Sequence, residues 1–296
     1  MPIFLTIVAI AVLAILWGSL IERNRFTVVP QELAVLPVGA TPIRILHISD
    51  LHVAPWQKRK LAWVRNLINL EPDLVIDTGD NLGHRDAIRP TLEALEPLLK
   101  VKGAFVNGSN DYHAPELRNP LAYLSKPSSP THKEVLPTTR MTDVFEAQGW
   151  LNLNNRSGAL TVSGTRIGFL GLDDPHDELA WFETLDQQRS DLGSQDLIVG
   201  VAHAPYLRVI DEFGSRGADL VLAGHTHGGQ VCLPKFGALI TNCDLPAKFA
   251  KGLSEHHIQG RKVWLNVCAG LGTSIFAPVR FFCKPEVRLL TLVAKA

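Results

Sequence analysis

The longest apolar run of the chain lies at its start, where the first twenty residues contain no charged side chain. A run of that length at helical rise is long enough to cross the hydrocarbon core of a bilayer. It predicts an uncleaved transmembrane anchor over residues 1–21, because no basic residue precedes the run, as a signal peptide would require. Arg23 and Arg25 follow it directly, and the positive-inside rule then predicts a single-pass protein of the cell membrane with the rest of the chain in the cytoplasm.

After a polar, Pro-containing linker predicted over residues 22–42, short apolar runs alternate with amphipathic segments. Strands are predicted at residues 44–49, 74–78 and 104–107, with helices at residues 57–70 and 87–99 between them. Later apolar runs at residues 159–162, 166–170, 197–202, 220–223, 263–267 and 287–293 predict a second half rich in strands. This alternation predicts one α/β domain over residues 43–296.

Residues 113–142 interrupt this rhythm with a segment rich in Pro, Ser and Thr. Such a segment is long for a structureless loop inside a compact domain, and long loops often carry function. Two interpretations stay open for it, a surface insertion and a lid that covers a substrate.

The composition of the chain says more about its binding partners than about its chemistry. The chain has 29 basic and 29 acidic residues, so no strongly basic face indicates a nucleic-acid partner. Its four cysteines, Cys232, Cys243, Cys268 and Cys283, lie in the last quarter without a C-x-x-C pair. That spacing argues against a zinc ribbon and predicts buried small residues. A disulfide between two of them would require that the domain face an oxidising compartment.

Five apolar runs each lead straight into a side chain that can bind a metal. These residues are Asp50 and His52, Asp80, Asn110, His203, and finally His225 and His227. Ligands of open α/β sheets gather outside the carboxyl ends of the strands, so the sequence predicts that these side chains converge. Each piece alone is more often a turn or a structural histidine, but the complete ordered set indicates one functional site.

The ordered blocks D-x-H, GDN, GSND, H and GHTH resemble the calcineurin-like metallophosphoesterase superfamily over about residues 43–293. The run GHTHGGQ at residues 224–230, followed by Pro234, is similar to a bacterial membrane-associated branch with YkuE- and YaeI-type enzymes. GSNDY at residues 108–112 and DDPH at residues 173–176 are similar to actinobacterial members of that branch. The resemblance implies a four-layer αββα sandwich of two mixed β-sheets flanked by helices.

The resemblance also implies a dinuclear centre, with Asp50, His52 and His227 on one divalent ion and Asp80 bridging to the second. The second ion would take its other ligands from the remaining residues of the set, Asn110, His203 and His225. Oxygen and imidazole ligands suit Mn, Fe, Zn or Mg, so the identity of the metals stays open. The implied activity is hydrolysis of a phosphodiester or phosphomonoester by a metal-bridging water.

The GSND block departs from the usual GNHD pattern of the superfamily, because no histidine stands in it. The resemblance favours Asn110 over Ser109 as the metal ligand, because in relatives the glycine that opens the third strand stands at the same sequence distance from the motif Asn as Gly103 does from Asn110. We expect Asp111 to be the catalytic residue that assists the leaving group. His84, His113 and His176 are alternatives, as is metal-bound water alone. Loss of the usual histidine predicts that activated phosphodiesters are better substrates than alkyl monoesters.

Two functions fit these observations. The leading hypothesis is a two-metal phosphoesterase at the membrane surface that acts on a lipid-linked or other phosphodiester. The alternative is a catalytically weak scaffold of the same fold that binds a protein partner. The native substrate, the metals and the oligomeric state are left open by the sequence.

Overall fold

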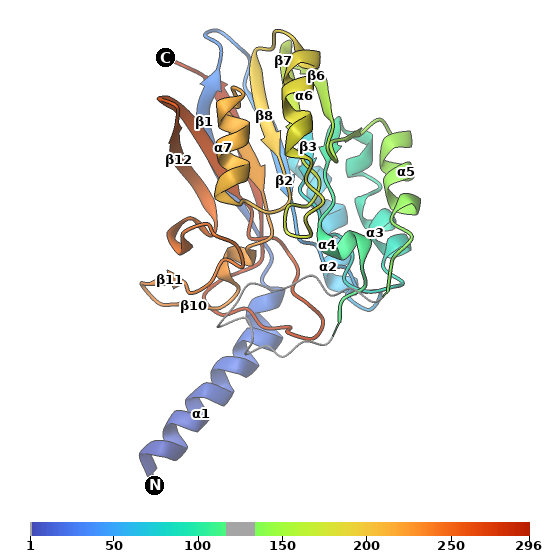
Figure 1. Cartoon of the computed structure of the whole chain (residues 1–296). Helices are drawn as coiled ribbons and strands as arrows, with labels where there is room; N and C mark the ends of the chain where they lie inside the picture. The colour runs from blue at the N-terminus through green and yellow to red at the C-terminus, as the bar shows by residue number, and fades with distance from the viewer. Residues whose placement is uncertain (1, 117–133) are drawn as a thin grey trace.

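The structure, a computed structural model, describes residues 2–116 and 134–296 of the chain (Figure 1). Its helices are α1 (Pro2–Leu16), α2 (Lys58–Arg65), α3 (Ile88–Leu95), α4 (Ser109–Tyr112), α5 (Thr139–Ala147), α6 (Leu185–Leu192) and α7 (Leu207–Ser215). Its strands are β1 (Thr27–Leu36), β2 (Ile43–Ile48), β3 (Leu74–Asp77), β4 (Gly103–Phe105), β5 (Leu151–Asn152), β6 (Ser157–Val162), β7 (Thr165–Gly171), β8 (Leu197–Val201), β9 (Leu220–Ala223), β10 (Cys232–Leu233), β11 (Gly237–Ala238), β12 (Gly252–Ile258), β13 (Arg261–Val267) and β14 (Glu286–Ala294).

Two six-stranded sheets form the centre of the domain. Their orders are β1-β14-β2-β3-β4-β5 and β12-β13-β9-β8-β7-β6, and a small β10-β11 hairpin stands apart. Strands β2 to β5 run parallel to one another, as do β7, β8, β9 and β13. Strand β14 pairs antiparallel with β2, which makes the first sheet mixed. The carboxyl ends of the parallel strands therefore meet at one end of each sheet.

The alternation of side chains along β2 shows how the two sheets pack. Ile43 and Ile45 face the layer between the sheets, where they meet Phe169 and Val199 of the second sheet. Ile48 points to the opposite face and joins the helical layer. Successive residues of a strand point to opposite faces, so an uninterrupted apolar run such as IRILHI fits a strand buried on both sides.

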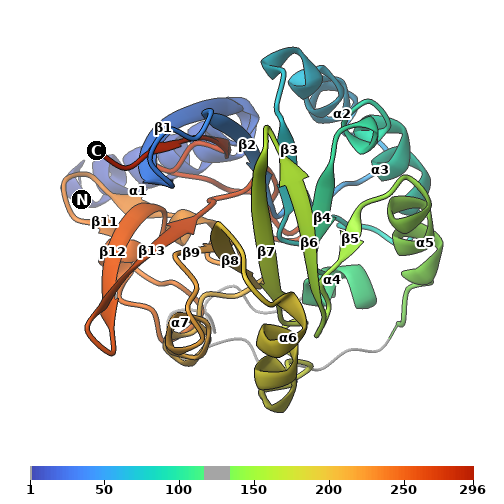
Figure 2. The same cartoon turned by 90° about the horizontal axis from the view of Figure 1, so that it is seen from above.

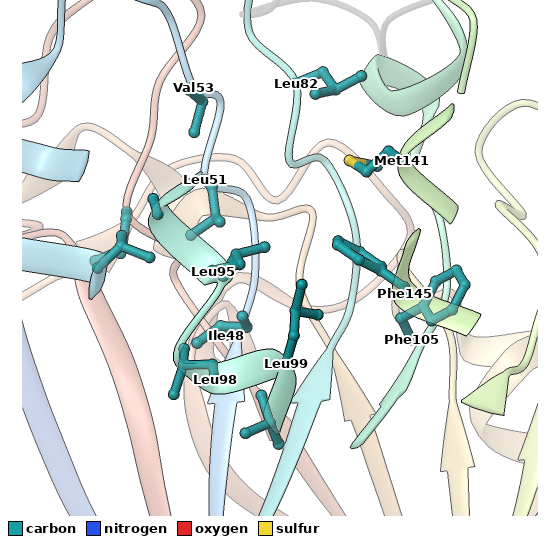
Figure 3. Close-up of a cluster of buried hydrophobic side chains, with 14 of the residues drawn as sticks. Ile48, Leu51, Val53, Leu82, Leu95, Leu98, Leu99, Phe105, Met141 and Phe145 are labelled. Carbon is teal, nitrogen blue, oxygen red and sulfur yellow. The ribbon is translucent and has the colours of Figure 1, made fainter. Parts of the chain in front are cut away.

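Helices cover the outer face of each sheet. Helices α2, α3 and α5 lie against the first sheet, and α6 and α7 lie against the second (Figure 2). Figure 3 shows the first of these layers, in which Leu95 and Leu99 from the α3 region approach Ile48, with Phe105 and Phe145 packed edge to face. The expected four-layer αββα sandwich of two mixed sheets is confirmed.

The N-terminal helix projects from the domain (Figure 1). With the helical turns that follow α1, it covers Ile3–Asn24, a span of 22 residues with a mean hydropathy of 2.6 and almost no burial. By length and composition this helix could span a membrane. Its last turns end where the folded domain begins.

Residues 22–42 are not the linker that the sequence predicts, because they contain β1. This strand pairs in parallel with β14 and forms one edge of the first sheet. Its alternating exposure and Pro30 hide the strand from a search for apolar runs, and proline is tolerated at a sheet edge. The partner strand lies near the other end of the chain, so local pattern carries no sign of the pairing.

The expected insertion over residues 113–142 lies partly outside the described residues, which omit 117–133. In its described parts, Val135 pairs with His113 across a short bridge, and α5 begins at Thr139. The cysteines are free thiols; Cys232, Cys268 and Cys283 are buried and Cys243 is half-buried.

Candidate metal centre

The strands of the two sheets deliver the predicted metal-binding residues to one end of the domain. Each residue comes shortly after a parallel strand, and Asn110 lies in the short helix α4. Asp50 and His52 follow β2, Asp80 follows β3, Asn110 follows β4, His203 follows β8, and His225 and His227 follow β9. Because the strand ends of both sheets meet there, the structure brings all seven side chains together.

The Asp80 carboxylate lies at the centre of this cluster and is buried. Its Oδ2 atom is 3.4 Å from His52 Nε2 and 3.5 Å from His203 Nε2. Asn110 reaches the same oxygen with its side-chain Nδ2 at 2.8 Å. It is thus the Asn110 side chain that reaches Asp80, while Ser109 begins α4 one residue earlier. A carboxylate between two sets of ligands is the arrangement that a bridging ligand needs.

The other ligands flank Asp80 on two sides. On one side His52 Nε2 is 3.2 Å from His227 Nε2, which is 3.6 Å from Asp50 Oδ1. On the other side His225 Nδ1 is 3.3 Å from His203 Nε2. Asp50 Oδ1 is buried and has no hydrogen-bond partner among the described residues. A buried carboxylate oxygen of this kind lacks the partner that burial normally requires, and a divalent cation fits that need.

The backbone of the site is strained. Asp50, His52, Asp80, His225 and His227 have positive φ angles of 49°, 39°, 57°, 67° and 49°. Non-glycine residues seldom adopt this left-handed conformation, and such residues gather at functional sites where the surrounding fold enforces them. The strain turns each side chain inward immediately after its strand.

Electrostatics favour ligand-competent protonation states at most of these residues. Burial lowers the pKa of His225 and His227 well below the usual value, which keeps both imidazoles neutral. Burial alone would raise the pKa of Asp80, but His203 and His52 hold it well below its usual range. Burial alone would lower the pKa of His203, but Asp80, with Asp174 and Asp50, raises it well above the usual value. A cation bound here therefore competes with the proton of His203.

Backbone N–H groups surround Asp111, an environment that argues against the expectation that it supplies a proton. Its carboxylate is fully buried, and both oxygens accept backbone hydrogen bonds. Oδ1 accepts from the N–H groups of Asn81 and Leu82, and Oδ2 accepts from those of Asp80 and Gly108. Burial and the Asp80 charge raise the pKa of Asp111, whereas the N–H donors oppose that rise. Asp111 therefore fixes the loop that carries Asp80.

Two buried cations support the site, and no sequence signal marks them. Lys60 Nζ donates to the backbone oxygens of Leu51 and His52. Arg280, which is fully buried, donates to the oxygens of Ala269 and Gly272 at 2.7 Å, and its guanidinium lies 3.3 Å from His227 Nδ1. Both side chains stabilise the loops around the metal-binding residues. The sequence around Lys60 is typical of an ordinary helix, and the sequence around Arg280 is typical of an ordinary loop.

Of the three histidines considered as alternative acids, His176 lies beside the ligands. Its ring centroid is 4.5 Å from that of His225, and its Nδ1 atom is 2.9 Å from the Tyr206 hydroxyl. His84 instead packs against Trp56 in a turn, and His113 lies near Asp177. Of these three, His176 is therefore the one whose ring contacts a predicted metal ligand.

The family follows from this geometry and from comparison with known proteins. A family model described as calcineurin-like phosphoesterase matches residues 43–229, which contain all seven clustered side chains. The chain belongs to this family. Members use a dinuclear metal centre, and the residues positioned here fit one. The chain is therefore a metal-dependent phosphoester hydrolase by family.

Curated relatives align along most of their length. The metallophosphoesterase YkuE of Bacillus subtilis is 27% identical over 92% of this chain and 86% of its own. The phosphodiesterase YaeI of Escherichia coli is 24% identical over 92% of this chain and 90% of its own. The UDP-2,3-diacylglucosamine pyrophosphatase LpxG of Chlamydia trachomatis is 25% identical over 96% and 94%. The predicted YkuE- and YaeI-type resemblance is thereby confirmed.

Proposed function

We propose that this protein hydrolyses a phosphodiester or pyrophosphate bond of a lipid-linked substrate at the membrane surface. In this proposal Asp80 would bridge two divalent ions. Asp50, His52 and His227 would hold the first ion. Asn110, His203 and His225 would hold the second.

The position of Asp80 is the observation that carries the proposal. One buried oxygen lies within 3.5 Å of imidazole nitrogens from both ligand sets. Asn110 donates both its backbone N–H and its side-chain amide to the same carboxylate. Rotation of that amide by half a turn exchanges nitrogen for oxygen at nearly the same place, which presents an oxygen ligand to a cation.

The chain's own residues then divide the work. Two divalent ions, when bound, supply an acidified water as nucleophile and neutralise charge on the phosphate. His203 is oriented by its Nδ1 atom, which lies 2.7 Å from the Thr78 carbonyl, so its Nε2 atom faces Asp80. His176, held against the Tyr206 hydroxyl, donates a proton to the leaving oxygen. This assigns to His176 the role that the GSND block leaves open.

The proximity of the N-terminal helix supports a substrate that resides in the membrane. The Arg280 backbone N–H donates to Gly18 O at 3.2 Å, and the Arg280 side chain contacts His227. Arg280 thus links the end of the helix to His227, one of the predicted metal ligands. LpxG, which aligns along nearly the whole chain, is named for cleavage of a diacylated sugar nucleotide. We propose that the helix spans the cell membrane and that the domain lies in the cytoplasm, because Arg23 and Arg25 directly follow the helix.

Turnover by the full-length protein in lipid nanodiscs tests the proposal. With Mn²⁺ present, we expect hydrolysis of bis-p-nitrophenyl phosphate, and of UDP-2,3-diacylglucosamine in the same bilayer. The matched Asp80→Asn variant should lose both activities. Hydrolysis of bis-p-nitrophenyl phosphate but not of UDP-2,3-diacylglucosamine would support the metal centre and refute the proposal of a lipid-linked substrate. A folded, metal-loaded protein that hydrolyses neither compound would favour the scaffold.

A further inference from the structure

Large apolar side chains are exposed in two loop segments at the end of the domain that carries α1. They come from the β10–β11 hairpin region and from the loop before β14, and we call them the apolar rim. The rim consists of Val231, Leu233, Phe236, Leu239, Phe276 and Phe282. Phe236 is 85% exposed and Phe282 is 57% exposed. Exposed apolar side chains of this size on two adjoining loop segments are typical of a surface that contacts another apolar phase.

The rim and the N-terminal helix form one unit. Val231 pairs with Phe281 across a short parallel bridge, which joins the two rim segments. The Cys283 N–H donates to the Glu22 carboxylate at 2.7 Å, and Trp17 Nε1 donates to the same carboxylate at 3.0 Å. Figure 1 shows β10 and β11 beside the end of α1 that joins the domain. The direction of the helix therefore fixes which face of the domain meets a membrane.

The charges around the rim match an anionic lipid surface. Residues 228–243 and 271–284 contain no Asp or Glu, while Lys235 and Lys284 are exposed beside the aromatic side chains. A cavity of about 290 Å³ next to the helix end is lined by Arg23, Lys58 and Arg59, among others. Aromatic and basic side chains together are typical of surfaces that lie in the interfacial region of a bilayer.

We propose that the apolar rim inserts into the interfacial region of the same bilayer that the N-terminal helix enters. The inference rests on the membrane anchor proposed above, and it adds a second contact that sets the tilt of the domain. The rim lies close to the metal centre along the chain, because Gly229, two residues after His227, packs against Ala238 of the hairpin. The insertion therefore holds the metal centre at headgroup level, facing lipid rather than bulk water.

Site-specific photocrosslinking to lipid tests this contact in the full-length protein. The photoreactive residue benzoylphenylalanine replaces Phe236, Leu13 or Val38, one at a time. Nanodiscs contain phosphatidylcholine and phosphatidylglycerol with a trace of radiolabelled phospholipid. Leu13 lies on α1 and reports the anchor. Val38, 80% exposed in the turn after β1, is the matched control, since Leu36 pairs with Ala294 at the end away from α1 (Figure 1).

We expect lipid label at positions 13 and 236, several-fold above the label at position 38. Label at position 13 with only control label at position 236 would overturn the rim contact and leave the anchor intact. Absence of label at both positions would overturn the anchor and the rim together. Crosslinks from position 236 to protein instead of lipid would also overturn the proposal, in favour of a protein partner. Enzyme activity enters none of these readouts, so failure of the proposed reaction stays distinguishable.

Discussion

Substitution of the buried Asp111 distinguishes a structural role for its carboxylate from a role as proton donor. Four backbone N–H groups point at its two oxygens, two at each, over distances of 2.8 to 3.2 Å. Asp111→Asn keeps the size of the side chain but replaces one oxygen by an N–H₂ group. In either orientation of the amide, two backbone donors then face a donor.

The cost follows from the hydrogen bonds that are lost. A buried backbone N–H group that is left without a partner costs about 1–3 kcal/mol, so two of them amount to roughly 2–6 kcal/mol of unfolding free energy. For a chain of this size, that loss lowers Tm by roughly 5–20 °C. The loop that carries Asp80 would loosen first, so metal affinity should fall as well.

Thermal unfolding of the full-length protein in detergent with a chelator measures this cost without any contribution from bound metal. Asp143→Asn, an exposed change on α5, is the matched control and should alter stability by no more than about 0.5 kcal/mol. If Asp111→Asn unfolds like the wild type, binds metal normally and still loses turnover, the structural role is refuted. Asp111 would then be the proton donor that the sequence suggested.

Three further outcomes are expected. Asn110→Ala should reduce metal content and remove most turnover, whereas Ser109→Ala should be mild; equal losses measured by mass spectrometry and assay would reverse this order. His176→Asn should lower kcat for alkyl phosphoesters by about 10²-fold, more than for p-nitrophenyl esters, with metal content unchanged; His84→Asn serves as the control with no change. Burial and the Arg288 charge lower the pKa of His47 to about 3, so only the unfolded chain takes up this proton between pH 6.5 and 3. Stability should therefore fall as pH falls through that window, by about 1.4 kcal/mol per pH unit from His47, and urea titrations should show a shallower decline in His47→Gln.

The strand ends were predictable from sequence because two signals coincide there. Each buried strand is a short apolar run, and the residue that follows it is polar and able to bind a metal. Parallel strands that carry such residues bring them to one edge, so the convergence around Asp80 follows from local pattern and sheet geometry. The choice of Asn110 over Ser109 also depends on local spacing, and the structure brings the Asn110 amide to Asp80.

The remaining features depend on contacts that no local pattern records. Strand β1 is held by a partner more than 250 residues away, and its pattern alternates around a proline. Lys60 and Arg280 are buried cations whose partners are backbone oxygens, which have no signature in the sequence. The sequence reveals an acidic residue, Asp111, in the GSND block. The four backbone N–H groups that bind its carboxylate are brought together only by folding.

The metal content of the folded protein tests the central claim most directly. The full-length wild type and Asp80→Asn are equilibrated with excess Mn²⁺, freed of unbound metal by gel filtration and measured by mass spectrometry. A bridging Asp80 predicts close to two ions per wild-type chain, with at least one of them lost in the variant. Fewer than about one ion per folded wild-type chain under these conditions, or equal content in both proteins, would contradict the dinuclear centre.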